Sequence, residues 1–310
     1  MGGMTFIQKA KALDYTKSVK YLLHDHLAGL EPDRGKKTVH ASELTKDEEV
    51  CPREYALYDV THAKPGSRYL STSENVTYTM GRVLQDIVVQ AFADMNKAIG
   101  HWRCPACNYL HEFQSRPWKC ASCGVKLPFK AEEVRFQSAV SGASCGIDLL
   151  LALGEPKLRA IEIKTIDKDM FKDKHTKKEL VAPLAEHKLR TAFYLRIIAE
   201  SGHPWSSLVA TDAATILYVS KGGYGCQDLT LKSWGLKEQF TPFKEFTVKR
   251  DDKMTEAMSQ RATVIKHFRD GKVGMPCGVC PTAFAKRAQF CAQRSPCFSG
   301  EYPAQYQWKA

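Results

Sequence analysis

The sequence has no run of about 18 consecutive apolar residues, the length that a membrane-spanning helix needs. Its opening stretch, MGGMTFIQKAKALDY, also lacks the apolar core of a signal peptide and the Ser or Thr that accompanies myristoylation. We therefore expect a cytoplasmic protein without a membrane partner. Acidic residues are scarce as well, since 34 Asp and Glu stand against 45 Lys and Arg, for a net charge of +11. This imbalance favours a polyanionic partner.

Hydrophobic residues are not scarce. They make up 44% of the 310 residues, which is enough to bury a full core. Residues 1–40 indicate a helix and a loop of unassigned role. Helices are predicted over about 43–62, 76–98, 185–200 and 251–269, and strands over 134–140, 146–153, 158–166 and 213–220. The order of these elements predicts an α/β fold, since a helix is followed by three strands, a second helix and a further strand.

The eleven cysteines would indicate disulfides in a secreted chain, but a reducing compartment makes metal binding the better interpretation. Four of them form two CxxC pairs separated by twelve residues: Cys104, Cys107, Cys120 and Cys123. This spacing is typical of a zinc ribbon, in which each pair supplies two thiolates. We predict a metal-stapled insertion over residues 101–126 that holds a structural Zn²⁺.

Other side chains of this insertion have two interpretations each. His101 and His111 are spare candidate ligands, although we expect both to face solvent. Trp102 and Trp118 either stack on bases or form the small core of the ribbon.

Five further cysteines join one early position to a group more than two hundred residues later: Cys51, Cys277, Cys280, Cys291 and Cys297. Zinc sites are usually formed by residues close in sequence, so this separation implies a second metal site of another kind. A second zinc site or simply buried thiols are the alternatives.

Glu162 and Lys164 share one face of a predicted strand, because successive strand residues point to opposite faces. Asp148 lies on the preceding strand, and a hairpin would bring it beside Glu162. Two carboxylates and one ammonium would then converge. Hard divalent ions such as Mg²⁺ bind through carboxylates, phosphate oxygens and water, so the trio is a candidate phosphoryl-transfer centre.

These motifs resemble the RecB-like branch of the PD-(D/E)xK nucleases. The resemblance lies in G-I-D, thirteen residues and E-I-K, with a preceding GRVLQD helix and a following HKLRTAFY helix. It implies a restriction-endonuclease-like core over residues 41–300, in which a mixed sheet is flanked by helices, and leaves 301–310 as a tail. Family members carry a further metal ligand, usually His, where Gln85 stands here. Their DNA-positioning Gln-x-x-x-Tyr corresponds to Arg190 and Tyr194, so only the tyrosine matches.

The CPR start at Cys51 and the late cysteines resemble the [4Fe-4S] pin of CRISPR-associated and phage RecB-like exonucleases and of AddB-type nucleases. The resemblance implies that Cys51, Cys291 and Cys297 bind the cluster together with Cys280, or with Cys277 as the alternative.

Taken together, the resemblance implies a DNA exonuclease or end-processing nuclease that uses Mg²⁺ or Mn²⁺ and acts in a bacterial cell or phage-infected host. Its DNA would be single-stranded or have free ends, and recombination, replication or CRISPR-adaptation proteins would be its partners. The alternatives are a sequence-selective endonuclease and a non-catalytic DNA-binding subunit of a larger complex.

Overall fold

The computed structural model of the protein describes residues 29–30, 38–45, 51–61, 69–126, 128–167, 180–222, 226–227, 235, 240–289, 291 and 293–299. The predicted helix and tail at 1–28 and 301–310 lie outside these residues. None of the described helices is long and apolar enough to cross a membrane.

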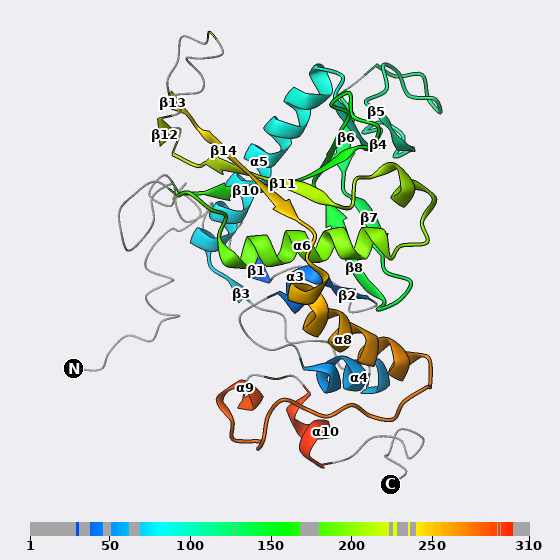
Figure 1. Cartoon of the computed structure of the whole chain (residues 1–310), viewed down its shortest axis with the longest axis vertical. Helices are drawn as coiled ribbons and strands as arrows, with labels where there is room; N and C mark the ends of the chain where they lie inside the picture. Colours follow the sequence, from blue (N-terminus) through cyan, green and yellow to red (C-terminus); the bar gives the residue numbers. More distant parts are fainter. Residues whose placement is uncertain are drawn as a thin grey trace, which may run out of the picture.

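A mixed seven-stranded sheet lies at the centre of the molecule (Figure 1). Its strands follow the order β14-β11-β10-β9-β4-β5, with β6 beside β4, and β10 and β11 are its parallel pair. Their bounds are β4 (Ala98–Arg103), β5 (Leu110–Ser115), β6 (Lys130–Glu132), β9 (Leu149–Leu151), β10 (Arg159–Ile166), β11 (Ala213–Ser220) and β14 (Phe243–Lys249). The predicted α/β fold with a mixed sheet flanked by helices is confirmed.

A second sheet of three strands joins the first at a bend. It consists of β2 (Val39–His40), β8 (Ala143–Ile147) and β7 (Val134–Gln137) in that order. The chain leaves β8 at Ile147, turns at Asp148 and enters β9 of the larger sheet. The single strand predicted over 146–153 is therefore wrong, because its two halves pair with different sheets.

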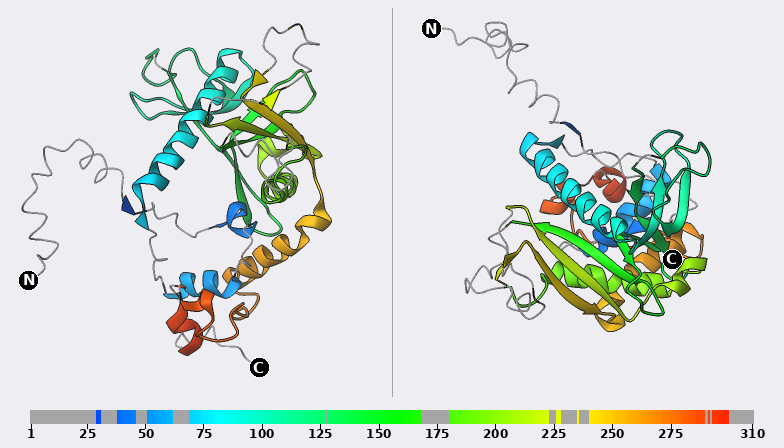
Figure 2. Two further views of the ribbon diagram at one scale, coloured as in Figure 1. Left: turned by 90° about the vertical axis from the view of Figure 1, so that its left-hand side faces the viewer. Right: turned by 90° about the horizontal axis from the view of Figure 1, so that it is seen from above.

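Two long helices cover opposite faces of β10 (Figures 1 and 2). Helix α5 (Thr72–Asp94) packs on the face that carries Ile161 and Ile163, whereas α6 (Ala185–Ala199) packs against Ile166 on the other face. Helix α5 begins at the N-cap Ser71, whose hydroxyl accepts the backbone N–H of Glu74 at 3.2 Å. The prediction of 76–98 started too late and ended inside β4.

Helices α4 (Pro52–Thr61) and α8 (Asp252–Arg269) pack together at one end of the molecule, next to α10 (Arg294–Ser299) and the short α9 (Lys286–Gln289) (Figures 1 and 2). Arg269 Nε and Asp59 Oδ2 lie 2.6 Å apart between the first two helices. The helix predicted over about 43–62 is not continuous. Helix α3 (Ala41–Leu44), capped by His40, precedes it, and residues 46–50 are outside the described part.

Five small elements complete the described structure. Strand β1 (Gly29–Leu30) pairs with β3 (Tyr69–Leu70) just ahead of α5, β12 (Cys226–Gln227) pairs with β13 (Phe240–Thr241), and the 3-10 helix η3 (Pro204–Leu208) precedes β11.

Candidate functional site

Asp148, Glu162 and Lys164 come together where β9 meets β10. The two strands pair antiparallel in a register that, continued by one residue, sets position 148 opposite position 162. Asp148 Oδ2 accepts the backbone N–H of Ile163 at 2.8 Å, and the ammonium of Lys164 forms an ion pair with the carboxylate of Glu162. The three side chains predicted to converge do so.

In this trio, two carboxylates share one ammonium at a site that is largely shielded from water. Loss of water and the nearby Glu162 raise the pKa of Asp148 well above its ordinary value, against the opposing effect of Lys164. Burial acts to lower the pKa of Lys164, but Glu162 and Asp148 outweigh it and the pKa is raised. Negative charge is in excess, so a cation bound between the carboxylates would be stabilised.

Tyr194 and Arg190 reach the trio from α6. Tyr194 is 6% exposed, and burial followed by the charge of Glu162 raises the pKa of its phenol well above the ordinary value. The guanidinium of Arg190 pairs with Glu186, and its Nε donates to Thr45 Oγ1 at 3.3 Å. The side chain of Arg190 is only 15% exposed, so it does not stand on the solvent-facing side of the helix.

Gln85 is half-buried on α5, the helix on the other side of β10 from Glu162. Among the described residues, no hydrogen bond joins Gln85 to Asp148, Glu162 or Lys164. A metal-ligand role for Gln85 stays a prediction.

Glu133 is a neighbour of the site that the sequence did not single out. Strands β7 and β8 pair so that position 133, one residue before β7, continues the register to Asp148. The carboxylate of Glu133 occupies the space that a Cβ at Gly146 would need, so a side chain at 146 would displace this carboxylate. Glu133 is a further, smaller cause of the raised pKa of Asp148. The only sequence signal was an acidic pair just before a strand, which is a common surface pattern.

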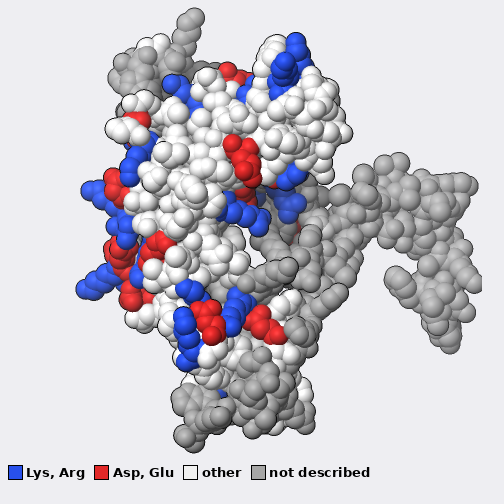
Figure 3. Space-filling model, turned by 90° about the vertical axis from the view of Figure 1, so that its right-hand side faces the viewer, with Lys and Arg blue, Asp and Glu red and all other residues white. Residues whose placement is uncertain are grey.

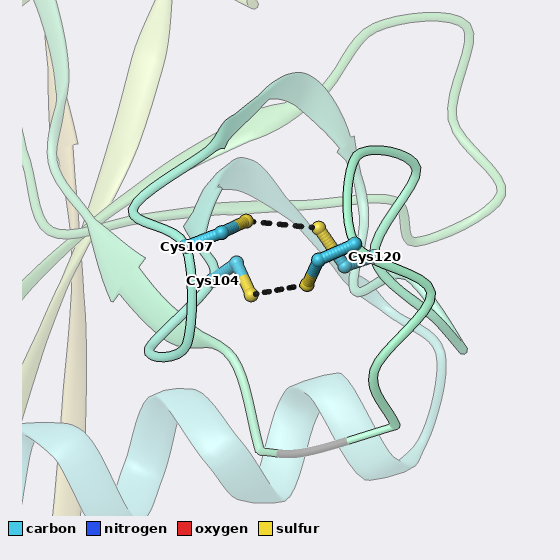
Figure 4. A group of neighbouring side chains, drawn as sticks. Cys104, Cys107 and Cys120 are labelled. Atoms are coloured by element: carbon cyan, nitrogen blue, oxygen red, sulfur yellow. Dashed lines mark hydrogen bonds between the residues drawn. The ribbon is translucent and has the colours of Figure 1, made fainter.

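Four cysteines form a compact group beyond the end of β4 (Figure 4). The sulfurs of Cys104 and Cys123 are 3.8 Å apart, those of Cys107 and Cys120 are 3.6 Å apart, and all four lie within 4.8 Å of one another. Each CxxC pair closes a tight turn, in which Asn108 N–H bonds to Cys104 O and Gly124 N–H bonds to Cys120 O, both at 2.9 Å. The predicted cluster is confirmed as a group able to hold a metal ion.

Two thiols of this group are acidified and a third is not. The pKa of Cys107 is lowered to about 7, chiefly because its sulfur accepts the backbone N–H of Tyr109. Burial acts to raise the pKa of Cys120, yet backbone N–H groups and the His111 ring together lower it. The backbone N–H of Val125 acts to lower the pKa of Cys123, but burial and the three neighbouring thiols raise it to about 12. Thiolates at neutral pH are the form that binds metals.

The prediction that His111 faces solvent is wrong, because its side chain is only 5% exposed. Its ring stands edge-on to Phe129. Its Nε2 lies beside Cys120 but makes no hydrogen bond of good geometry to a described residue.

Of the two tryptophans, one is part of the core and the other is exposed. Trp102 is 1% exposed and donates from Nε1 to Gln114 O, whereas Trp118 is 79% exposed.

The second group of cysteines surrounds a cavity between α4 and the segment that contains α9 and α10. Cys51, Cys280, Cys291 and Cys297 all line it, and Cys277 does not. The thiols of Cys51 and Cys280 lie near enough to Cys297 to affect its pKa, which burial raises. Arg53 holds this segment by donating from Nε to Pro276 O at 2.8 Å.

Comparisons with known proteins leave the family open. No protein-family model matches the chain, and no curated protein matches it. Among solved structures, the crystal structure of SSO0001 matches over 90% of this chain and 93% of its own, with 12% sequence identity and a TM-score of 0.32. A likeness of that size carries no argument about fold or function.

Proposed function

We propose that this chain is a metal-dependent DNA nuclease of the PD-(D/E)xK type, with a RecB-like arrangement of its core. The observation that carries the proposal is the convergence of Asp148, Glu162 and Lys164 at the bend between two sheets. A basic chain of net charge +11 supports a polyanionic substrate. Lys and Arg side chains border a hollow near the middle of the face in Figure 3, with acidic side chains scattered among them.

Asp148 and Glu162 would hold the divalent ion, Mg²⁺ or Mn²⁺. The residues fit such an ion, because burial and the neighbouring Glu162 raise the pKa of Asp148, and a divalent cation would supply positive charge that favours both ionised carboxylates. When bound, the ion supplies acidification of a water and polarisation of the scissile phosphate. Lys164, held beside Glu162, stays charged and would offset the negative charge that develops on phosphorus.

Arg190 and Tyr194 have positioning roles in this proposal. Arg190 is tied to Glu186 and Thr45 and is nearly buried, so it would orient the centre electrostatically rather than grip DNA from the surface. Tyr194 lines the same small cavity as Glu162 and would limit where that carboxylate can turn.

The test uses linear end-labelled DNA and closed circular DNA, each with Mg²⁺ or Mn²⁺. We expect cleavage of linear DNA that is abolished in Asp148→Ala, Glu162→Ala and Lys164→Ala while folding and DNA binding persist. Glu155→Ala is the matched control, because this carboxylate lies in the turn between β9 and β10 and pairs with Arg159. Cleavage by Asp148→Ala protein at the wild-type rate would remove the proposed centre.

The form of the product separates the alternatives. Cutting of circular DNA at defined positions would identify a sequence-selective endonuclease. DNA binding without any metal-dependent product would identify a non-catalytic binding subunit. Release of nucleotides from ends would fit end processing in recombination, repair or replication, together with the protein partners that such work requires.

The two cysteine groups would hold different metals. Cys104, Cys107, Cys120 and Cys123 would bind a structural Zn²⁺. Cys51, Cys280, Cys291 and Cys297 line one cavity, and a cavity lined by four thiols suits a [4Fe-4S] cluster.

Anaerobically purified protein should therefore be brown and contain about four iron and four sulfide per chain, with about one zinc. Cys280→Ser should lose the iron, whereas Cys277→Ser, the matched control outside the cavity, should keep it. Two zinc ions and no iron would overturn the cluster and leave the nuclease centre untouched.

A further inference from the structure

Trp118 is an exposed aromatic ring on a part of the molecule that metal would make rigid. Its exposed fraction is 79%, whereas Trp102 of the same region is 1% exposed. A large apolar ring kept in water gains none of the free energy that burial would give. A single exposed ring is ordinary by itself, so what surrounds Trp118 decides its interpretation.

The chain is anchored on both sides of Trp118. Two residues before it, Arg116 donates to Gln90 Oε1 at 2.9 Å and to Asp94 Oδ1 at 2.6 Å, which ties the segment to α5. Two residues after it, Cys120 is 1% exposed within the four-cysteine group. Because both flanks are anchored, little conformational entropy is lost when a ligand packs on the ring.

A cation accompanies the ring. Lys126 Nζ lies 5.3 Å from the centre of the Trp118 ring, and Lys119 is the next residue in the chain. Both lysines are exposed, and neither pairs with a carboxylate in the described structure. An ammonium beside the ring disfavours an apolar protein pocket as the occupant and favours a ligand that combines a flat ring with negative charge.

The ribbon is also connected to the proposed active site. Strand β4 leads directly into the ribbon, and its residue His101 pairs with Glu132 of β6. The next residue, Glu133, continues the β7–β8 register to Asp148. Figure 1 shows β4, β5 and β6 together beside one end of α5. Two strand pairings and one step along the backbone therefore separate the strand that leads into the ribbon from Asp148.

We propose that Trp118 and Lys126 form a stacking site for an unpaired base of single-stranded DNA, with Lys126 also contacting a backbone phosphate. Stacking on an aromatic ring tolerates any base, so the site would sense that the strand is single rather than read its sequence. The choice of DNA as ligand rests on the proposed function, but the stacking itself requires no catalysis.

Binding is measured by fluorescence anisotropy with protein that carries Asp148→Ala, so that cleavage plays no part. The two probes are a labelled oligothymidylate and an abasic oligonucleotide of the same length and charge. Trp118→Ala should weaken binding of the base-bearing probe by roughly 5- to 100-fold and leave the abasic probe nearly unchanged. Trp118→Phe should retain most of the affinity.

The control variant is Phe284→Ala, because Phe284 is equally exposed at 79% but lies far from the ribbon in sequence. It should bind both probes like the parent protein. The zinc content of each variant shows that the ribbon is intact. Equal losses for both probes, or no loss for either, would overturn the stacking site, and a change in self-association on removal of Trp118 would identify a protein contact instead. If the wild-type protein never cuts DNA but Trp118 still confers a preference for the base-bearing probe, the nuclease proposal is refuted and the stacking site stands.

Discussion

Gly81 sets how closely α5 approaches the strand that carries Glu162 and Lys164. A Cβ added at Gly81 would lie 3.0 Å from Thr165 Oγ1, which is closer than such atoms normally pack. Thr165 directly follows Lys164 on β10, and Gly81 precedes Gln85 by about one helical turn. The substitution Gly81→Ala therefore tests whether the helix and the strand are in direct contact.

Two effects of opposite sign determine the size of the change. Replacing glycine by alanine inside a helix stabilises the folded protein by about 1 kcal/mol, because glycine loses more backbone conformational entropy on folding. Forcing a methyl group into a packed contact costs about 1 to 3 kcal/mol. We expect Gly81→Ala to be neutral or to lower the free energy of unfolding by up to about 2 kcal/mol.

Thr165→Ala provides the control, since it removes the atom that the new methyl group meets. In that background Gly81→Ala should stabilise by about 1 kcal/mol, so the double-mutant cycle should show a coupling of about 1 to 3 kcal/mol. The measurement is urea unfolding followed by circular dichroism at constant metal content. Stabilisation by about 1 kcal/mol in both backgrounds would refute the close approach.

Three other perturbations have signs that the structure fixes. Because burial and Glu162 raise the pKa of Asp148, the folded metal-free protein binds the proton more tightly than the unfolded chain, and stability should fall as pH rises from the ordinary aspartate pKa towards the raised one. Asp148→Asn should abolish this fall in thermal unfolding across pH, and an unchanged pH profile would contradict it. His111→Phe should weaken zinc binding by about 10- to 100-fold in chelator competition, because it removes the buried Nε2, which is unpaired among the described residues and would donate to the Cys120 thiolate in the zinc-bound protein. His111→Gln should retain more affinity, and equal affinities in all three proteins would exclude that role. DNA affinity should fall steeply with salt in a chain of charge +11, and a nearly flat dependence would argue against phosphate contacts.

The sequence predicted best those elements whose pattern is local and strong. Strand β11 and helices α6 and α8 have the predicted bounds to within about a residue, because buried residues recur along each at a regular spacing. The meeting of Asp148 with Glu162 followed from strand alternation and a short turn. The four ribbon cysteines followed from spacing alone.

What the sequence left unseen depends on partners distant in the chain. The break at Asp148 exists because β8 and β9 join different sheets, and no local signal distinguishes this from one continuous strand. Glu133 matters only because β7 lies beside β8. His111 is polar by composition, yet Phe129, eighteen residues away, covers it. Strand β14 is a sheet edge whose side chains are mostly exposed or half-buried, so its apolar pattern is weak.

The contact between α4 and α8 has a consequence for how the protein is made. Asp59 and Arg269 are 210 residues apart, and at 5 to 20 residues per second a ribosome would need roughly 10 to 40 s to deliver the second after the first. During that interval the buried face of α4, with Ala56 and Leu57, has no α8 to cover it. Nascent chains would thus carry an uncovered apolar helix throughout synthesis of the sheet, which makes this helix the place where a chaperone would bind or premature aggregation would begin.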